Sequence, residues 1–177
     1  MTQVSGPRVD GAEVLLLGDI DRGALARLLG EFALNLVGVG DGETIPGSYW
    51  GEPEAGVIVD AVYARADTPV HSVLHEASHL IVAGPQRRTS IHTDASDCDH
   101  EENATCYLQI ALAEKLADVG AMRLMMDMDA WGYSFRMGST RDWFERDADD
   151  ARSWLVDRGL LPYPNIAPNL AAGDAPV

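Results

Sequence analysis

Apolar residues recur along most of this chain with helical spacing, and only short stretches have the composition of strands. From residue 21 to residue 37, apolar side chains return every three or four positions, which predicts an amphipathic helix. Residues 56–63 are rich in β-branched side chains and predict a strand. The segment 38–56 between them is rich in Gly and Pro and predicts a loop. Together these patterns indicate an α+β fold.

The clearest helix signals come directly after the predicted strand. Thr68-Pro69 is typical of an N-cap followed by the first helical residue, and Gly84-Pro85 is typical of a helix end. Most side chains between them are apolar, so we expect this central helix to be largely buried.

The remainder of the chain predicts further helices. One opens at Glu101, and Gly120 either ends it or only interrupts it. Another begins at Ser139, and residues 149–158 predict a last helix that ends at Gly159.

Length and composition fit one globular domain. The chain has 177 residues, of which 46% are hydrophobic, which suffices for one core but not for two. We predict a single domain at residues 1–161, in which a small sheet packs on the central helix, and a loosely packed tail at residues 162–177.

The net charge of the chain limits the classes of partner that it is expected to bind. A net charge of −15 argues against nonspecific binding to nucleic acid or to anionic membranes, and it suits a basic substrate. No apolar run has the length of a membrane span, and the first eleven residues lack the features of a signal peptide, so we expect a cytoplasmic protein.

Two cysteines, Cys98 and Cys106, are too few for a disulfide framework and are expected to be reduced.

The central helix carries the motif His75-Glu76-Ala77-Ser78-His79, which has the pattern H-E-x-x-H. Two imidazoles four residues apart lie on one face of a helix and can bind one divalent ion, Fe(II) or Zn(II). Glu76 points elsewhere on the helix, where it can reach a water at the metal and act as the catalytic residue. The alternative is a pair of hydrogen-bonded core histidines, which is less favourable because buried polar groups need partners.

A metal site needs a third protein ligand. Val82 and Pro85 occupy the positions where the metzincin extension requires Gly and His, so that variant is excluded. A carboxylate on the following helix is the other common solution. The helical spacing of apolar residues places Glu101 near the centre of the buried stripe and Glu102 to its side. We therefore predict Glu101 as the third ligand, with Glu102 as the alternative and ordinary first-turn acids as the simpler interpretation.

Other polar residues near the motif are candidates for substrate binding. His71 lies one turn before His75 on the same face, or simply at an exposed first turn. Arg87 and Arg88 follow the helix end, and we predict that at least one pairs with a buried acid or anchors a substrate carboxylate. Residues 91–100 could bind a second ion or line the cleft, although a solvated acidic connection is the simpler interpretation.

The stretch from His75 to Arg88 resembles the elongation factor P hydroxylase family. In that family the H-E-x-x-H motif is followed by an apolar pair, then Ala-Gly and, shortly after, Arg-Arg, as it is here. The likeness covers roughly residues 25–116. Leu80 stands where the family has an aromatic residue, and the segment before Glu101 is shorter and more acidic. The resemblance implies a non-haem metal site that hydroxylates a modified lysine on a translation factor.

Two functions follow from these residues, both in a zincin-like domain. The resemblance favours a hydroxylase or similar oxidative enzyme that uses Fe(II) and acts on a protein-borne or small, lysine-like substrate. The alternative is a small zinc-dependent peptidase or other hydrolase, in which Glu76 is the general base that takes a proton from water. A metal-stabilised interaction module is disfavoured, because structural sites usually have four Cys and His ligands.

Overall fold

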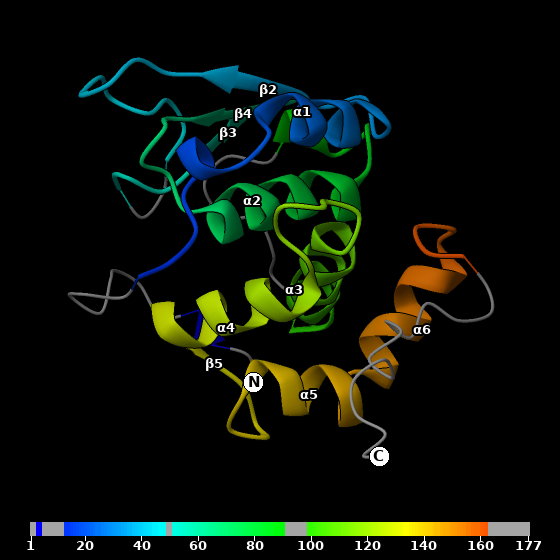
Figure 1. Ribbon diagram of the computed structural model, residues 1–177. Coiled ribbons are helices and arrows are strands. Elements are labelled where there is room, and N and C mark those ends of the chain that lie inside the picture. The colour runs from blue at the N-terminus through cyan, green and yellow to red at the C-terminus, as the bar shows by residue number, and fades with distance from the viewer. Residues whose placement is uncertain (1–2, 5–12, 49–50, 91–98, 163–177) are drawn as a thin grey trace.

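The computed structural model describes residues 3–4, 13–48, 51–90 and 99–162, which form six α-helices and two small sheets (Figure 1). The predicted mixture of helices with a small sheet is confirmed. None of the helices in these ranges has the length and apolar character that crossing a membrane requires. In chain order the elements are β1 (Gln3–Val4), the 3-10 helix η1 (Leu17–Asp19), α1 (Arg22–Gly30), β2 (Asn35–Gly38), β3 (Gly56–Ile58), β4 (Ala61–Ala64), α2 (Val70–Ala83), the 3-10 helix η2 (Arg88–Ser90), α3 (Asp99–Ala113), α4 (Ala121–Trp131), β5 (Tyr133–Ser134), α5 (Thr140–Arg146) and α6 (Asp149–Asp157).

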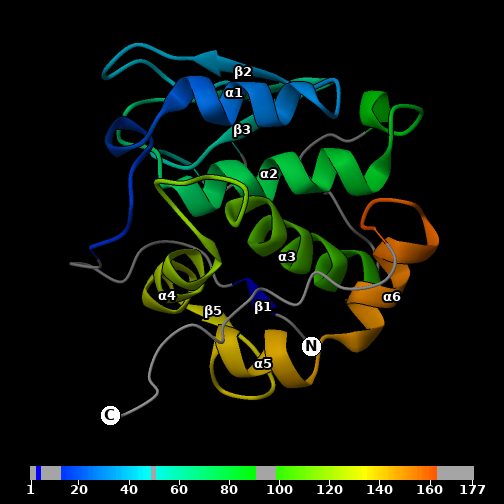
Figure 2. The ribbon, with the colours of Figure 1, turned by 45° about the vertical axis from the view of Figure 1, so that its right-hand side comes forward.

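The larger sheet lies on one side of the central helix α2, and most of the other helices lie on its opposite side (Figures 1 and 2). The strand order is β2–β4–β3, with β2 parallel and β3 antiparallel to β4. Val62 in the middle strand pairs with Leu36 on one side and with Val57 on the other. Helix α1 packs against β2, whereas α3 and α4 pack against α2. The helix that carries the H-E-x-x-H motif is therefore covered from both sides.

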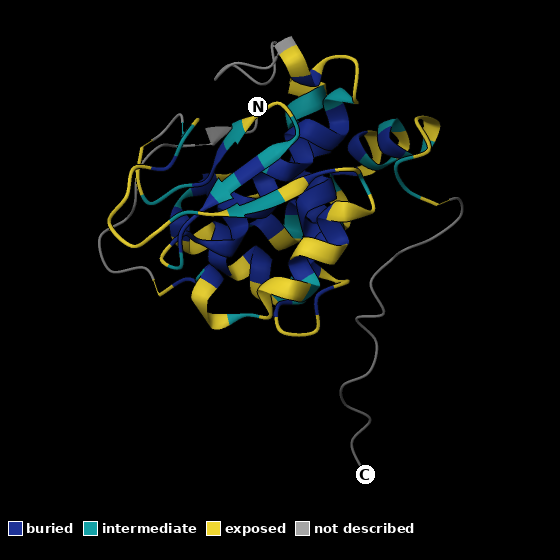
Figure 3. Ribbon diagram, turned by 90° about the horizontal axis from the view of Figure 1, so that it is seen from above, coloured by how far each residue is buried: buried dark blue, intermediate teal, exposed yellow. Residues whose placement is uncertain are grey.

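Helix α2 is buried along almost its whole length, as predicted from its apolar composition (Figure 3). Every residue from Val70 to Val82 is buried except Glu76. The helix begins one residue later than expected, because Pro69 is the N-cap and the Thr68 hydroxyl instead accepts a hydrogen bond from the Arg65 backbone N–H at 2.9 Å.

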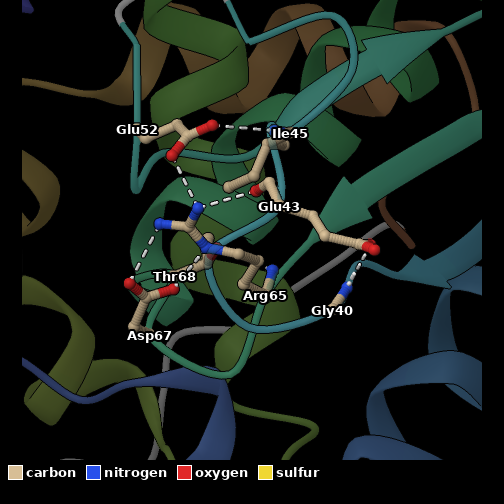
Figure 4. A network of polar contacts seen from close by, with 7 residues as sticks. All are labelled: Gly40, Glu43, Ile45, Glu52, Arg65, Asp67 and Thr68. Atoms are coloured by element: carbon tan, nitrogen blue, oxygen red, sulfur yellow. Dashed lines mark hydrogen bonds and ion pairs between the residues drawn. The ribbon is translucent and has the colours of Figure 1, made fainter.

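Arg65 joins the loop between β2 and β3 to the turn that leads into α2 (Figure 4). Its side chain is buried, and its guanidinium donates to the backbone carbonyl of Glu43 at 2.7 Å. It also donates to the carboxylates of Glu52 at 2.6 Å and of Asp67 at 2.9 and 3.0 Å. The Arg65 guanidinium thus holds the Gly- and Pro-rich loop against the turn before α2 through charged hydrogen bonds.

Two predicted elements differ from the structure. The helix expected at residues 21–37 ends at Gly30, because the chain turns at Ala33 (φ 56°) and the following residues pair with β4. The strand expected at residues 56–63 is two strands, which meet at a tight turn where Val59 has φ 56°. β-Branched residues rarely adopt positive φ. Turns with positive φ are usually predicted from Gly or Asn, and neither Ala33 nor Val59 is one of these residues.

The later helices begin and end close to the Gly and Ser residues that predicted their limits. The run from Glu101 is broken rather than only interrupted: α3 ends at Ala113, and Gly120 (φ 74°) is the N-cap of α4. The Ser139 hydroxyl caps α5 by accepting the backbone N–H of Asp142 at 3.1 Å. Gly159 (φ 69°) follows the end of α6. The predicted tail lies, from residue 163 onward, outside the described residues.

Arg88 anchors the C-terminal end of α2. Its side chain is only 5% exposed, and its Nε donates to the carbonyl of Leu80 at 3.0 Å. The terminal nitrogens donate to the carbonyl of Phe32 at 3.0 Å and to the carboxylate of Asp60 at 3.1 Å. A single guanidinium therefore connects the last turn of α2 to the end of α1 and to the β3–β4 turn.

Replacing Arg88 by Ala should lower the free energy of unfolding by about 2–4 kcal/mol, because several buried acceptors lose a charged donor. Arg87→Ala is the matched control: that side chain is 53% exposed, and its loss should change stability by at most about 1 kcal/mol. Urea denaturation measures both values. Equal effects of the two substitutions would contradict the anchoring role.

Candidate metal centre

Three side chains from α2 and α3 converge between these two helices. The Nε2 atoms of His75 and His79 lie 3.0 Å apart. The carboxylate of Glu102 lies 3.7 Å from Nε2 of His75 and 3.4 Å from Nε2 of His79. One donor atom from each residue lies within 4.8 Å of the other two, which is the spacing of ligands around a single metal ion.

Polar residues of α3 orient the two imidazoles. Gln109 Oε1 lies 2.9 Å from Nδ1 of His75, and Thr105 Oγ1 lies 3.4 Å from Nδ1 of His79. The Gln109 amide oxygen can only accept, so we assign the Nδ1–H tautomer to His75, and the same tautomer to His79 with Thr105 as acceptor. Both Nε2 atoms then direct their lone pairs toward the same point, as metal-binding histidines do when their other nitrogen donates to a neighbour.

This donor set fits a divalent cation. Two lone pairs 3.0 Å apart repel each other unless a cation or a proton lies between them. Nitrogen ligands about 2.0–2.1 Å from zinc are about 2.8–3.4 Å apart at angles of about 90–110°, a range that includes the separation seen here. Burial lowers the pKa of His79 well below its ordinary value, so this imidazole is neutral and can act as a ligand.

Glu101, the preferred third ligand, does not lie in this group, whereas its alternative Glu102 does. The Glu101 carboxylate instead accepts two hydrogen bonds from the Arg87 guanidinium, at 2.7 and 3.1 Å. Helix α3 is buried around most of its circumference, so its apolar stripe did not identify the face that meets α2. Polar residues were the more useful signal: Thr105 and Gln109 follow Glu102 by about one and two turns, in the part of the helix that is otherwise mostly apolar.

Glu76, the predicted catalytic residue, follows His75 directly and is half-buried, whereas the other residues from Val70 to Val82 are buried. Burial raises the pKa of its carboxyl to about 7, and the charges of Glu54 and Glu102 raise it further while His75 opposes them. A carboxyl in these surroundings exchanges its proton near neutral pH, which suits acid–base work.

Glu54 is a third acidic residue near the cluster, and no sequence pattern indicated it. It lies in the Gly- and Pro-rich loop, and its Oε1 accepts a hydrogen bond from the Trp131 indole at 3.1 Å. The next residue, Ala55, donates its backbone N–H to Ser72 Oγ on α2 at 3.0 Å. Burial raises the pKa of Glu54, whereas the Trp131 hydrogen bond and the charge of His75 lower it. Only the tertiary course of the loop brings this residue to the site.

His71 lies on the buried wall next to the cluster rather than at an exposed first turn. Its ring is 1% exposed and packs 4.9 Å from Trp131 and 5.6 Å from Tyr133, measured between ring centroids. Within the described part of the chain, neither ring nitrogen has a hydrogen-bond partner. Burial lowers the pKa of His71 to about 3, with a smaller contribution from His75, so the ring is neutral. Its role in substrate binding stays a prediction.

The other predicted substrate residues pair with groups outside the cluster. Arg87 pairs with Glu101, whose side chain is 18% exposed, and Arg88 donates to the carbonyls of Leu80 and Phe32 and to Asp60. Residues 91–98, considered for a second ion, lie outside the described residues, and His100 is exposed in the first turn of α3.

Comparisons of the chain with models of protein families, with curated proteins and with solved structures give no match. The resemblance to the elongation factor P hydroxylase family therefore stays a prediction. The basis for a proposed function is therefore the geometry of the His75, His79 and Glu102 cluster.

Replacing Glu102 by Ala should abolish stoichiometric binding of Zn(II), because it removes one of three ligands. His75→Ala and His79→Ala should have the same effect. Glu101→Ala is the control on the same helical turn and should leave metal content unchanged, because Glu101 pairs with Arg87. Elemental analysis after dialysis measures the metal content. Unchanged content in Glu102→Ala, or loss in Glu101→Ala alone, would contradict this ligand set.

Replacing Gln109 by Leu should weaken Zn(II) binding by about 10- to 100-fold without changing its stoichiometry, because the His75 ring loses the acceptor that orients it. Gln86→Leu, at an exposed position beyond α2, is the matched control. Competition with a chromogenic chelator gives both affinities. Equal affinities in the two variants would show that Gln109 does not orient the ligand.

Proposed function

We propose that this chain is a metal-dependent enzyme with a zincin-like arrangement, in which His75, His79 and Glu102 hold one divalent ion. Three protein ligands leave coordination positions for water and substrate, whereas structural zinc sites usually have four Cys or His ligands. Among the described residues, no other His, Cys, Asp or Glu belongs to the group. An open site of this kind supports catalysis rather than a purely structural role.

Of the two reactions compatible with these ligands, the geometry favours hydrolysis with Zn(II). The observation that carries this preference is the position of Glu76 beside the cluster, with its pKa raised to about 7. When bound, the ion supplies Lewis acidity to the reacting carbonyl or phosphoryl group. Glu76 accepts a proton from the attacking water and then transfers it to the leaving group.

The charge around the cluster favours a substrate with a positive group near the reacting bond. Glu54 and Glu76 add two carboxylates to the one that Glu102 supplies, and the chain as a whole has a net charge of −15. A negatively charged site attracts cationic ligands and raises their local concentration. A lysine-like or other basic group in a small molecule or on a protein fits this requirement.

The outer edge of β3 argues against an extended peptide that adds to the sheet as a further strand. The Val57 backbone N–H, at the middle of this strand, donates to the Gly47 carbonyl at 3.4 Å. A Cβ built at Gly47 would lie 2.4 Å from the Val57 carbonyl oxygen, so the two backbones touch. Because the chain's own loop covers this position, strand addition there would require the loop to move. A small amide, ester or side-chain substrate is more compatible with the site.

An iron-dependent hydroxylase is the second candidate. Two histidines and one carboxylate also form the ligand set of non-haem Fe(II) oxygenases. The stretch from His75 to Arg88, with its resemblance to the elongation factor P hydroxylase family, favours this reaction. In that case Glu76 moves protons or holds structure instead of activating water for hydrolysis.

Loading the metal-free protein separately with Zn(II) and with Fe(II) distinguishes the two candidates. Each form is incubated with panels of small amides, esters and lysine-containing peptides, with and without oxygen, and the products are analysed by mass spectrometry. Hydrolysis by the zinc form without oxygen is the expected result. Glu76→Gln should lower that rate by about 10²- to 10⁴-fold while the metal content stays unchanged.

Glu43→Gln is the control for removing a carboxylate from the same loop that carries Glu54, since Glu43 is exposed and, among the described residues, its carboxylate accepts only the nearby Gly40 N–H at 3.1 Å. It should retain the wild-type rate. Addition of one oxygen atom by the iron form, together with an inactive zinc form, would overturn the hydrolytic proposal and support the second candidate.

A further inference from the structure

Tyr133 is a buried aromatic residue on the wall of the metal centre. Its ring lies 5.9 Å from the ring of His75 and 5.6 Å from that of His71, nearly perpendicular to both. It follows Gly132, whose left-handed conformation (φ 107°) ends α4 and turns the chain toward the cluster. The ring also stacks on Phe135, with 6.5 Å between centroids. These contacts fix the ring next to a predicted metal ligand.

The hydroxyl of Tyr133 is available as a donor at this position. None of the hydrogen bonds among the described residues engages it, although the residue is only 8% exposed. A phenol with the ordinary tyrosine pKa of about 10 keeps its proton at neutral pH. The acidic residues close enough to interact electrostatically with this phenol are Cys106, Glu54, Glu102 and Glu76.

A neutral phenol among these groups can donate a hydrogen bond toward a ligand bound at the cluster. The carboxylates of Glu54, Glu76 and Glu102 can accept protons, but an ionised carboxylate cannot donate a hydrogen bond. Reactions at a carbonyl or phosphoryl group place negative charge on an oxygen atom, which a positioned donor stabilises. In the described part of this wall, Tyr133 is the side chain that combines a free hydroxyl with a position against His75.

We propose that the Tyr133 hydroxyl donates a hydrogen bond to a negatively charged oxygen of the ligand bound at the His75, His79 and Glu102 site. This inference rests on the proposed function, because it requires a metal at that site. It assigns to Tyr133 a contact with the ligand itself and not a role in holding the metal. The class of ligand is one that presents an anionic oxygen, such as a hydroxamate, a carboxylate or the tetrahedral form of an ester or amide.

Titration of the Co(II)-loaded protein with acetohydroxamate tests this contact, with the visible absorption of the cobalt as readout. Tyr133→Phe removes the hydroxyl and keeps the ring, so it should retain one cobalt ion and bind acetohydroxamate about 10- to 100-fold more weakly. Tyr107→Phe is the matched control. Tyr107 is also buried, but its ring stacks 4.5 Å from that of Phe144 and not on a histidine of the cluster. It should bind acetohydroxamate like the wild type.

A second ligand separates a lost hydrogen bond from a disturbed site. Ethanethiolate offers sulfur, a weak acceptor, and should bind equally well to the wild type and to Tyr133→Phe. Equal acetohydroxamate affinities in these two proteins, or an equal loss for both ligands, would overturn the assignment of Tyr133. Absence of a cobalt spectrum in the wild type would instead refute the metal site, and with it the proposed function.

Discussion

The structure depends on a polar interface buried between two helices. His75 and His79 on α2 face Glu102, Thr105 and Gln109 on α3, within an otherwise apolar core. Burying this many polar groups is unfavourable unless each finds a partner. The outer nitrogens of both imidazoles have partners on α3, whereas their Nε2 atoms meet each other at 3.0 Å. The proposed divalent cation would satisfy both nitrogens and the carboxylate together, and would thereby also stabilise the packing of α2 against α3.

The residues around this interface differ in how firmly they are held. The three proposed ligands lie on long, buried helices, and Arg88 ties the end of α2 to the neighbouring elements. Glu54 comes from a loop, which Arg65 holds through carboxylate and carbonyl contacts (Figure 4). Tyr133 follows directly after a helix end. Ligands on rigid elements keep their geometry, while acid and donor groups on connecting segments can adjust to a substrate.

Sequence patterns predicted the central helix that carries the motif, because its apolar composition and the Gly-Pro pair at its end determine structure through neighbouring residues. They failed at Val59, where contacts made elsewhere in the fold stabilise a turn that this residue type disfavours. They chose Glu101 over Glu102 because an apolar stripe identifies a core face only when the other faces of the helix are exposed, and α3 is buried nearly all round. Glu54 could not be predicted at all, since its approach to the site depends on the course of a loop.

X-ray absorption spectroscopy of the stoichiometric zinc form tests the central claim most directly, because it reports the ligands of the ion without requiring a substrate. We expect the zinc ion to have only nitrogen and oxygen neighbours, at about 2.0–2.1 Å, together with the outer-shell scattering of two imidazoles. Glu102→Ala should lose ordered zinc, while Glu101→Ala should give the wild-type spectrum. A sulfur neighbour at about 2.3 Å, which would implicate Cys98 or Cys106, or a spectrum with fewer than two imidazoles, would contradict it.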